Sequence, residues 1–206
     1  LGGGPEAPVI QRVATGAVAF GVTNADDVLN ARAREAPVVA LMAPYQINPR
    51  CIMVHAASGI ERIADIGDLT IALSQRPAFS HYLKKKYPFP GVKLVPYPGN
   101  VTQFLMDPNF AQQAYIFSEP FVARKQGADP RALLVSDTGF NPYASVLIAT
   151  EKTVADRREL VEAVVQATAE GWQIYLDNPG RTNHHIHQLN PEMGLDILEY
   201  GARESR

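Results

Sequence analysis

The chain has 206 residues and a formal charge of −2, from 19 basic and 21 acidic side chains. With 46% hydrophobic residues it can bury a sizeable core, as one large domain or two small ones. The near-neutral charge provides no basic surface, which argues against nucleic acid and anionic membranes as partners. A single cysteine, Cys51, excludes an internal disulfide framework and a cysteine-rich zinc site.

Eight short apolar runs with β-branched residues predict buried strands. In chain order they are 17–22, 38–43, 51–55, 69–73, 92–95, 114–117, 133–136 and 145–150. Segments with helical spacing lie between them, at 26–36, 78–86, 101–106 and 121–126. A capping box, Thr153-x-x-Asp156, predicts the start of a long amphipathic helix that stops at 177–180. The alternation predicts an α/β fold with largely parallel sheets.

Two segments, 44–49 and 139–143, each couple an Asn-Pro dipeptide to an aromatic residue. Because Asn-Pro is a strong loop signal, these segments predict chain crossings between two lobes. The stretch between them has its own strands and helices, enough for a small α/β lobe. We therefore predict one lobe from residues 1–45 and 143–206, and a second lobe from residues 46–142.

Several motifs, in this order and spacing, carry a resemblance to a known family. They are 13–22, 37–49 with Gln46-x-Asn48-Pro49, 58–72, Ser118-Glu119-Pro120-Phe121 and Gly139-Phe140-Asn141-Pro142-Tyr143. With them the chain resembles the periplasmic solute-binding proteins of ABC importers, in the branch of nitrate, taurine, alkanesulfonate, thiamine-pyrimidine-precursor and riboflavin binders. The resemblance implies a type II periplasmic-binding-protein fold: α/β, with two mixed sheets flanked by helices and two hinge crossings.

The resemblance runs from about residue 2 to residue 200, without the family's leading strand and helix. We therefore expect an N-terminally incomplete first lobe, with any missing pocket wall, signal peptide or lipid anchor before Leu1. It also implies a periplasmic or extracytoplasmic monomer that binds a small-molecule ligand and a membrane permease, with no cofactor.

Glu119 is the leading candidate for a ligand contact. It follows a predicted strand, and ligands of open α/β sheets bind outside the carboxyl ends of strands. Pro120 marks the first turn of a helix, whose N-terminal end favours the ionised carboxylate. Such a carboxylate accepts hydrogen bonds from the N–H groups of a heterocycle and repels sulfonate or nitrate. The alternative is that Glu119 only caps its own helix.

Eleven further polar or aromatic candidates follow predicted strands or flank the two crossings. They are Thr23, Asn24, Tyr45, Gln46, Asn48, Ser74, Tyr97, Asn100, Phe140, Asn141 and Tyr143. Rings at the crossings can sandwich a flat ligand, or can be hinge packing. The amide groups suit a neutral or zwitterionic heterocycle. For the residues that follow strands, helix capping and turn chemistry are the alternatives.

The predicted function is the substrate-binding component of an ABC importer, which captures a small polar or aromatic nitrogen-containing solute between two lobes and is not an enzyme. Three alternatives stay open: a binder of sulfonate or nitrate, a pyrimidine-synthase-like enzyme, and a ligand-sensing domain of a larger regulator. The cysteine-rich signature of the pyrimidine synthases is absent around Cys51. No metal site is predicted, because His184, His185 and His187 lack an acidic ligand at a suitable step.

Overall fold

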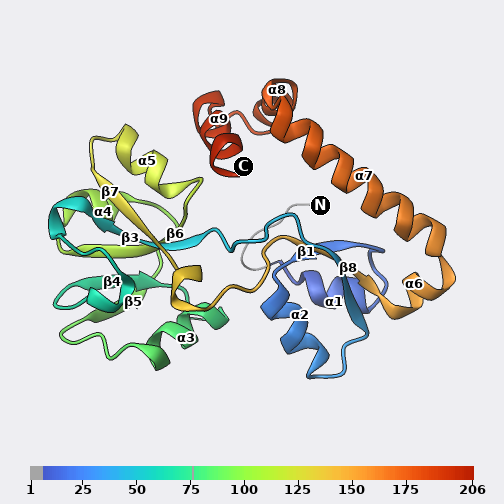
Figure 1. Ribbon diagram of the computed structural model, residues 1–206, viewed down its shortest axis with the longest axis horizontal. Coiled ribbons are helices and arrows are strands. Elements are labelled where there is room, and N and C mark those ends of the chain that lie inside the picture. The colour runs from blue at the N-terminus through green and yellow to red at the C-terminus, as the bar shows by residue number, and fades with distance from the viewer. Residues whose placement is uncertain (1–6, 76) are drawn as a thin grey trace. The chain divides into compact units, whose positions relative to one another are not determined.

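The computed structural model describes residues 7–75 and 77–206. The first residues of predicted lobe 1, the start of the family resemblance and Arg76 lie outside the described residues. The chain divides into two compact units, Leu1–Ile47 with Pro142–Ile174 and Asn48–Asn141 with Tyr175–Arg206. The boundaries near residues 47 and 141 fall inside the two segments predicted as crossings. Each unit is described by itself below (Figure 1).

The first unit has a three-stranded sheet in the order β1 (Gly21–Thr23), β8 (Val146–Thr150), β2 (Val38–Met42). Both pairs are antiparallel, so the prediction of a parallel or mixed sheet is wrong here. The reason is that β8, which returns from far along the chain, lies between the two early strands and runs opposite to both. The helices α1 (Val9–Ala14) and α2 (Ala25–Arg32) pack on this sheet.

The predicted strand at 17–22 is present only from Gly21. Helix α1 precedes it and ends in a turn in which Gly16 has a φ of 74°. Within this turn the Val18 N–H donates to the Arg12 carbonyl at 3.2 Å. The turn occupies the first residues of the apolar run, so periodicity alone placed the strand too early.

The second unit has a five-stranded sheet in the order β5-β4-β6-β3-β7. The strands are β3 (Arg50–His55), β4 (Thr70–Leu73), β5 (Lys93–Pro96), β6 (Phe110–Tyr115) and β7 (Pro130–Leu134). β4 is parallel to β5 and β6, whereas β3 is antiparallel to β6 and β7. Therefore β4, β5 and β6 end at the edge of the sheet where β3 begins. We call this edge the carboxyl edge.

Helices cover both faces of the five-stranded sheet. Helix α3 (Ala78–Lys86), which has the predicted bounds, buries Phe79 and Leu83 on the face that carries Ile52 and Ile71. Helices α4 (Thr102–Met106) and α5 (Glu119–Lys125) cover the other face. Side chains alternate along a strand, so β3 contributes Ile52 to one core and Met53 to the other. Burial on both faces explains why the strands read as continuous apolar runs.

The predicted capping box at Thr153 is wrong by three residues. Thr150 is the N-cap, and its hydroxyl accepts from the Thr153 N–H at 2.9 Å. The predicted single helix is divided into α6 (Glu151–Asp156) and α7 (Arg158–Asp177), because Arg157 leaves helical geometry with a φ of −136°. None of the helices in the described ranges is long and apolar enough to cross a bilayer.

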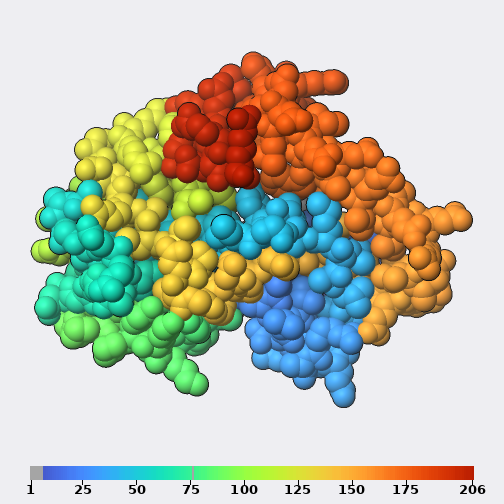
Figure 2. Space-filling model, in the orientation of Figure 1, coloured from blue at the N-terminus to red at the C-terminus, as the bar shows by residue number. Residues whose placement is uncertain are grey.

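The C-terminal helices α8 (Gly180–Leu189) and α9 (Leu195–Glu204) belong to the second unit, where the predicted lobe boundary had assigned them to the first. Helix α9 lies beside α5 (Figure 2). The Tyr200 hydroxyl donates to the Ile116 carbonyl at 3.1 Å, and Lys125 forms an ion pair with Asp196. These contacts between residues distant in sequence account for the assignment.

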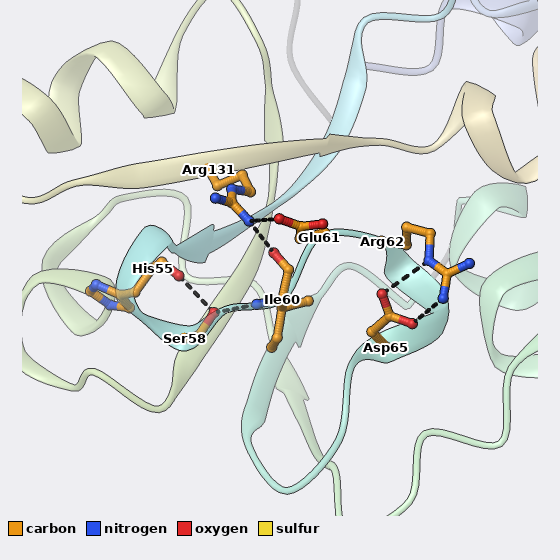
Figure 3. A network of polar contacts seen from close by, with 7 residues as sticks. All are labelled: His55, Ser58, Ile60, Glu61, Arg62, Asp65 and Arg131. Atoms are coloured by element: carbon orange, nitrogen blue, oxygen red, sulfur yellow. Dashed lines mark hydrogen bonds and ion pairs between the residues drawn. The ribbon is translucent and has the colours of Figure 1, made fainter.

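A network of polar contacts holds the connection from β3 to β4 (Figure 3). The Arg131 guanidinium donates to the Ile60 carbonyl at 3.1 Å and lies 3.6 Å from the Glu61 carboxylate. Arg62 donates two hydrogen bonds to Asp65, at 2.8 and 3.1 Å. Because β3 ends and β4 begins here, the network lies at the sheet edge opposite to the carboxyl edge.

Candidate functional site

The carboxyl edge brings together four of the predicted contacts of the second unit. Ser74 follows β4, Tyr97 follows β5, Glu119 comes shortly after β6, and Asn48 precedes β3. The parallel register aligns the last residues of β4 and β5, Leu73 with Pro96. The topology of a single sheet thus explains how residues far apart in sequence reach one edge.

Glu119 is held by two hydrogen bonds at this edge. The Tyr97 hydroxyl donates to Oε1 at 2.7 Å, and the Tyr115 N–H donates to Oε2 at 2.9 Å. The carboxylate therefore points back to the end of β6, and among the described residues no bond from it to an amide of its own helix is found. Each oxygen retains a lone pair for a further donor.

The Glu119 carboxylate also affects its neighbours electrostatically. Burial, and secondly the charge of Glu119, raises the pKa of the Tyr97 phenol far above its usual range. Tyr97 is consequently a permanent hydrogen-bond donor. Burial, followed by the same charge, raises the pKa of the Cys51 thiol. Cys51 is fully buried and protonated, which makes it a poor nucleophile.

Ser74 is joined to Gln113 of β6, a residue that the sequence reasoning missed. The Ser74 N–H donates to Gln113 Oε1 at 2.6 Å, and Gln113 Nε2 donates to the Ser74 hydroxyl at 2.9 Å. A polar residue inside an apolar strand is a signal that could have identified Gln113. Asn100 accepts from the Thr102 N–H at 3.0 Å and so closes a turn, which is the alternative considered for it.

Arg50, the first residue of β3, is a second residue that the sequence reasoning missed. Its guanidinium carbon lies 4.7 Å from the ring centroid of Phe79 and 5.4 Å from that of Tyr115. Tyr115 is its partner across the β3–β6 pair, and Phe79 lies in the first turn of α3. The only sequence signal was a cation directly before a buried strand.

Asn48 and Asn141 join the two ends of the segment Asn48–Asn141 of the second unit. The Asn48 N–H donates to Asn141 Oδ1 at 2.7 Å, and Asn48 Oδ1 accepts from the Arg50 N–H at 3.1 Å. Asn48 is buried, so these two hydrogen bonds have a structural role. Phe140 packs against Tyr82 with 5.0 Å between ring centroids, as the hinge-packing alternative describes.

In the first unit, Thr23 and Asn24 both approach Asp27. Their side chains donate to Asp27 Oδ2 at 3.0 and 3.5 Å, and Asn24 occupies the N-cap position of α2. Tyr45 contacts Trp172 edge to face, with 5.4 Å between the ring centroids. The two hydrogen bonds occupy part of the polar capacity of Thr23 and Asn24, but the Asn24 side chain makes no cap hydrogen bond to α2. The Tyr45 ring packs as the hinge-packing alternative describes.

The remaining predicted contacts of the first unit are the most exposed. Gln46 is exposed, and its Nε2 donates to the Ala43 carbonyl at 2.9 Å. Tyr143 is 47% exposed, while its carbonyl accepts from the Ala25 N–H at 2.9 Å. The backbone of Tyr143 is thereby fixed and its ring faces outward.

Two of the three histidines of α8, His184 and His187, contact backbone carbonyls. His184 Nδ1 lies 2.9 Å from the Gly180 carbonyl oxygen, and His187 Nδ1 lies 2.7 Å from that of Met193. Within the described part of the chain, no group of three His, Cys, Asp or Glu side chains is placed to hold a metal ion.

Comparison with known proteins identifies related sequences. The model of the family described as NMT1/THI5 like matches residues 2–182. The riboflavin-binding protein RibY of Chloroflexus aurantiacus is 28% identical over 94% of this chain. A formylaminopyrimidine-binding protein of Halalkalibacterium halodurans is 26% identical over 95% of it. The chain spans only 58% and 62% of the lengths of these two relatives.

Solved structures give the same fold. The periplasmic aliphatic sulphonate-binding protein SsuA of Escherichia coli has a TM-score of 0.74 at 14% identity, covering 96% of this chain and 65% of its own. The alkanesulfonate-binding protein SsuA of Xanthomonas axonopodis, bound to MOPS, has a TM-score of 0.67 at 13% identity, covering 94% and 68%. The predicted fold class is confirmed: two sheets flanked by helices, as in periplasmic binding proteins.

Proposed function

The chain belongs to the NMT1/THI5-like family, and on this premise we propose that it is the substrate-binding component of an ABC importer. Its solute is a small polar or aromatic compound that carries nitrogen. The related riboflavin-binding and formylaminopyrimidine-binding proteins support this class of solute. The proposed site is the carboxyl edge of the second unit's sheet.

One observation carries the proposal: the half-buried Glu119 carboxylate fixed by Tyr97 and Tyr115. Both partners are donors, so two hydrogen bonds orient the carboxylate. Its remaining lone pairs suit the N–H groups of a heterocycle, and desolvation strengthens such bonds. Ser74 adds a hydroxyl at the same edge. The predicted contacts of the first unit, Thr23, Asn24, Tyr45, Gln46 and Tyr143, stay predictions.

The proposed role makes and breaks no bond, and it implies a membrane permease as partner and an extracytoplasmic location for the monomer. The competing proposal is an enzyme of the pyrimidine-synthase type, which needs bound pyridoxal phosphate or iron. An absorption spectrum of the purified chain separates the two, because either group colours the protein.

A thermal-shift screen with pyrimidines, flavins, taurine and nitrate tests the proposal directly. A compound that binds only the folded state raises the melting temperature. We expect a pyrimidine or a flavin to do so, and Glu119→Ala to abolish the shift. Glu192→Ala, at an exposed glutamate, is the matched control. A shift with nitrate alone, or one unaffected by Glu119→Ala, would contradict the proposal.

A further inference from the structure

Arg50 and Arg131 are the half-buried arginines in the described part of the second unit, and they are held differently. Arg62 and Arg131 lie against carboxylates, Arg206 donates to the Leu176 carbonyl, and Arg124 to the Tyr200 hydroxyl. Among the described residues, the Arg50 guanidinium has no carboxylate, carbonyl or hydroxyl partner. It is held by the Phe79 and Tyr115 rings alone. The exposed Arg203 also lies over a ring, 5.5 Å from the Tyr200 centroid. The Arg50 side chain is half-buried.

Ring contacts fix a guanidinium without consuming its hydrogen bonds. An aromatic face attracts the cation through its quadrupole, while the N–H donors lie in the plane of the guanidinium. Phe79 is 1% exposed and cannot easily move, so one of the two rings belongs to the rigid core. The guanidinium is therefore positioned before any ligand arrives, with its fork of N–H groups available.

Arg50 and the proposed site lie at the same edge of the sheet. Arg50 lies at the carboxyl edge and faces Tyr115 across the β3–β6 pair. The Tyr115 N–H in turn binds Glu119. One residue thus contacts both a cation and an anion, although no ion pair joins Arg50 to Glu119. The backbone N–H of Arg50 is bound to buried Asn48, which fixes the start of the strand.

We propose that Arg50 binds an anionic oxygen group of the solute, a carboxylate, sulfonate or phosphate, by a bidentate pair of hydrogen bonds. This inference rests on the proposed function and narrows it. The solute then carries an N–H donor for Glu119 and an oxyanion for Arg50. Simple anions such as nitrate lack the donor and meet the charge of Glu119, whereas neutral heterocycles leave Arg50 without a partner.

Pairs of probes that differ by one anionic group test the inference. Suitable pairs are flavin mononucleotide with riboflavin, a pyrimidine carboxylate with its carboxamide, and taurine with ethanolamine. Their dissociation constants are measured by calorimetry on the wild-type chain, Arg50→Gln, Arg50→Lys and the control Arg62→Gln. The three pairs distinguish phosphate, carboxylate and sulfonate as the source of the oxyanion.

We expect the anionic member of at least one pair to bind wild type at least about tenfold more tightly, which corresponds to a charge-assisted hydrogen bond. Arg50→Gln removes this preference, Arg50→Lys retains part of it, and Arg62→Gln leaves it intact. If Arg50→Gln does not fold, Arg50→Lys provides the reading, because a compact ammonium cannot reproduce the planar fork.

Two negative results have different meanings. Binding of neutral members with no preference for anionic ones, or a preference that survives both Arg50 variants, overturns the inference and leaves the proposed function standing. Failure of all six compounds to bind wild type, with an unchanged melting temperature, counts against the proposed function and removes the basis of the inference.

Discussion

Two charged groups at the carboxyl edge are fixed by opposite means. Glu119 is held by hydrogen bonds from Tyr97 and Tyr115, which use one lone pair on each oxygen. Arg50 is held by the rings of Phe79 and Tyr115, which use none of its donors. The comparison teaches that how a charge is held determines what it can still bind. Glu119 keeps part of its hydrogen-bonding capacity, and Arg50 keeps all of it with respect to the residues that the structure describes.

The largest effect is expected from Phe79→Ala, which removes the buried ring beneath Arg50. Phe79 is 1% exposed within the core formed by α3 and the sheet. Truncation of such a residue lowers the free energy of unfolding by about 3–5 kcal/mol. Urea titration measures it. Phe79→Leu is the matched variant, because it keeps most of the volume and loses the ring, and should cost about 1 kcal/mol. Equal losses in the two variants would mean that the ring, and not its volume, is what stabilises this part of the core.

The next largest effect is expected from Glu119→Ala, which removes the charged group held by hydrogen bonds. It leaves the Tyr97 hydroxyl and the Tyr115 N–H without their acceptor, which costs roughly 1–3 kcal/mol of unfolding free energy. Glu119→Gln retains one acceptor and should lose less. Urea unfolding of both variants at pH 7 measures the difference. If the two variants lose the same free energy of unfolding, the charge of Glu119 and not its hydrogen bonds stabilises this part of the carboxyl edge.

Alkaline pH tests how the Glu119 carboxylate affects the neighbouring Cys51 thiol. Burial and the Glu119 charge raise the pKa of the Cys51 thiol. Above about pH 8.5 the unfolded chain releases this proton while the folded chain keeps it, so unfolding free energy falls by up to about 1.4 kcal/mol per pH unit. Below that pH the thiol is protonated in both states and has no effect.

Cys51→Ala tests this between about pH 8.5 and 10, below the range in which Tyr97 begins to contribute. The variant should show a constant offset at neutral pH and a shallower alkaline decline than wild type. Urea unfolding across this pH range measures the slopes. Parallel slopes would show that the thiol titrates alike in both states.

The smallest effect is expected from Arg62→Gln in the β3–β4 connection. Arg62 is exposed and paired with Asp65, and exposed ion pairs contribute little to stability. The free energy of unfolding should be unchanged within the error of a urea titration. A clear loss would indicate that the polar network at this opposite edge stabilises the whole sheet.

Local signals in the sequence were sufficient for part of the fold. The helix at 78–86 has its predicted bounds, because apolar spacing and the basic last turn are properties of the segment itself. Glu119 is found in the first turn of α5, as Pro120 predicts, although β6 (Phe110–Tyr115) begins and ends earlier than the strand predicted at 114–117. The predicted start of β1 and the predicted N-cap at Thr153 were at the wrong residues, because neighbouring turns determine both positions.

By itself the sequence determined the α/β class, the family and the strand ends at which Glu119, Tyr97 and Ser74 lie. Tertiary structure alone decided the antiparallel pairing of β8, the bond between Tyr97 and Glu119, and the placement of Arg50 between two rings. The physical reason is that periodicity and turn chemistry act over a few residues. The contacts of Arg50 join three segments that only strand order and helix packing bring together.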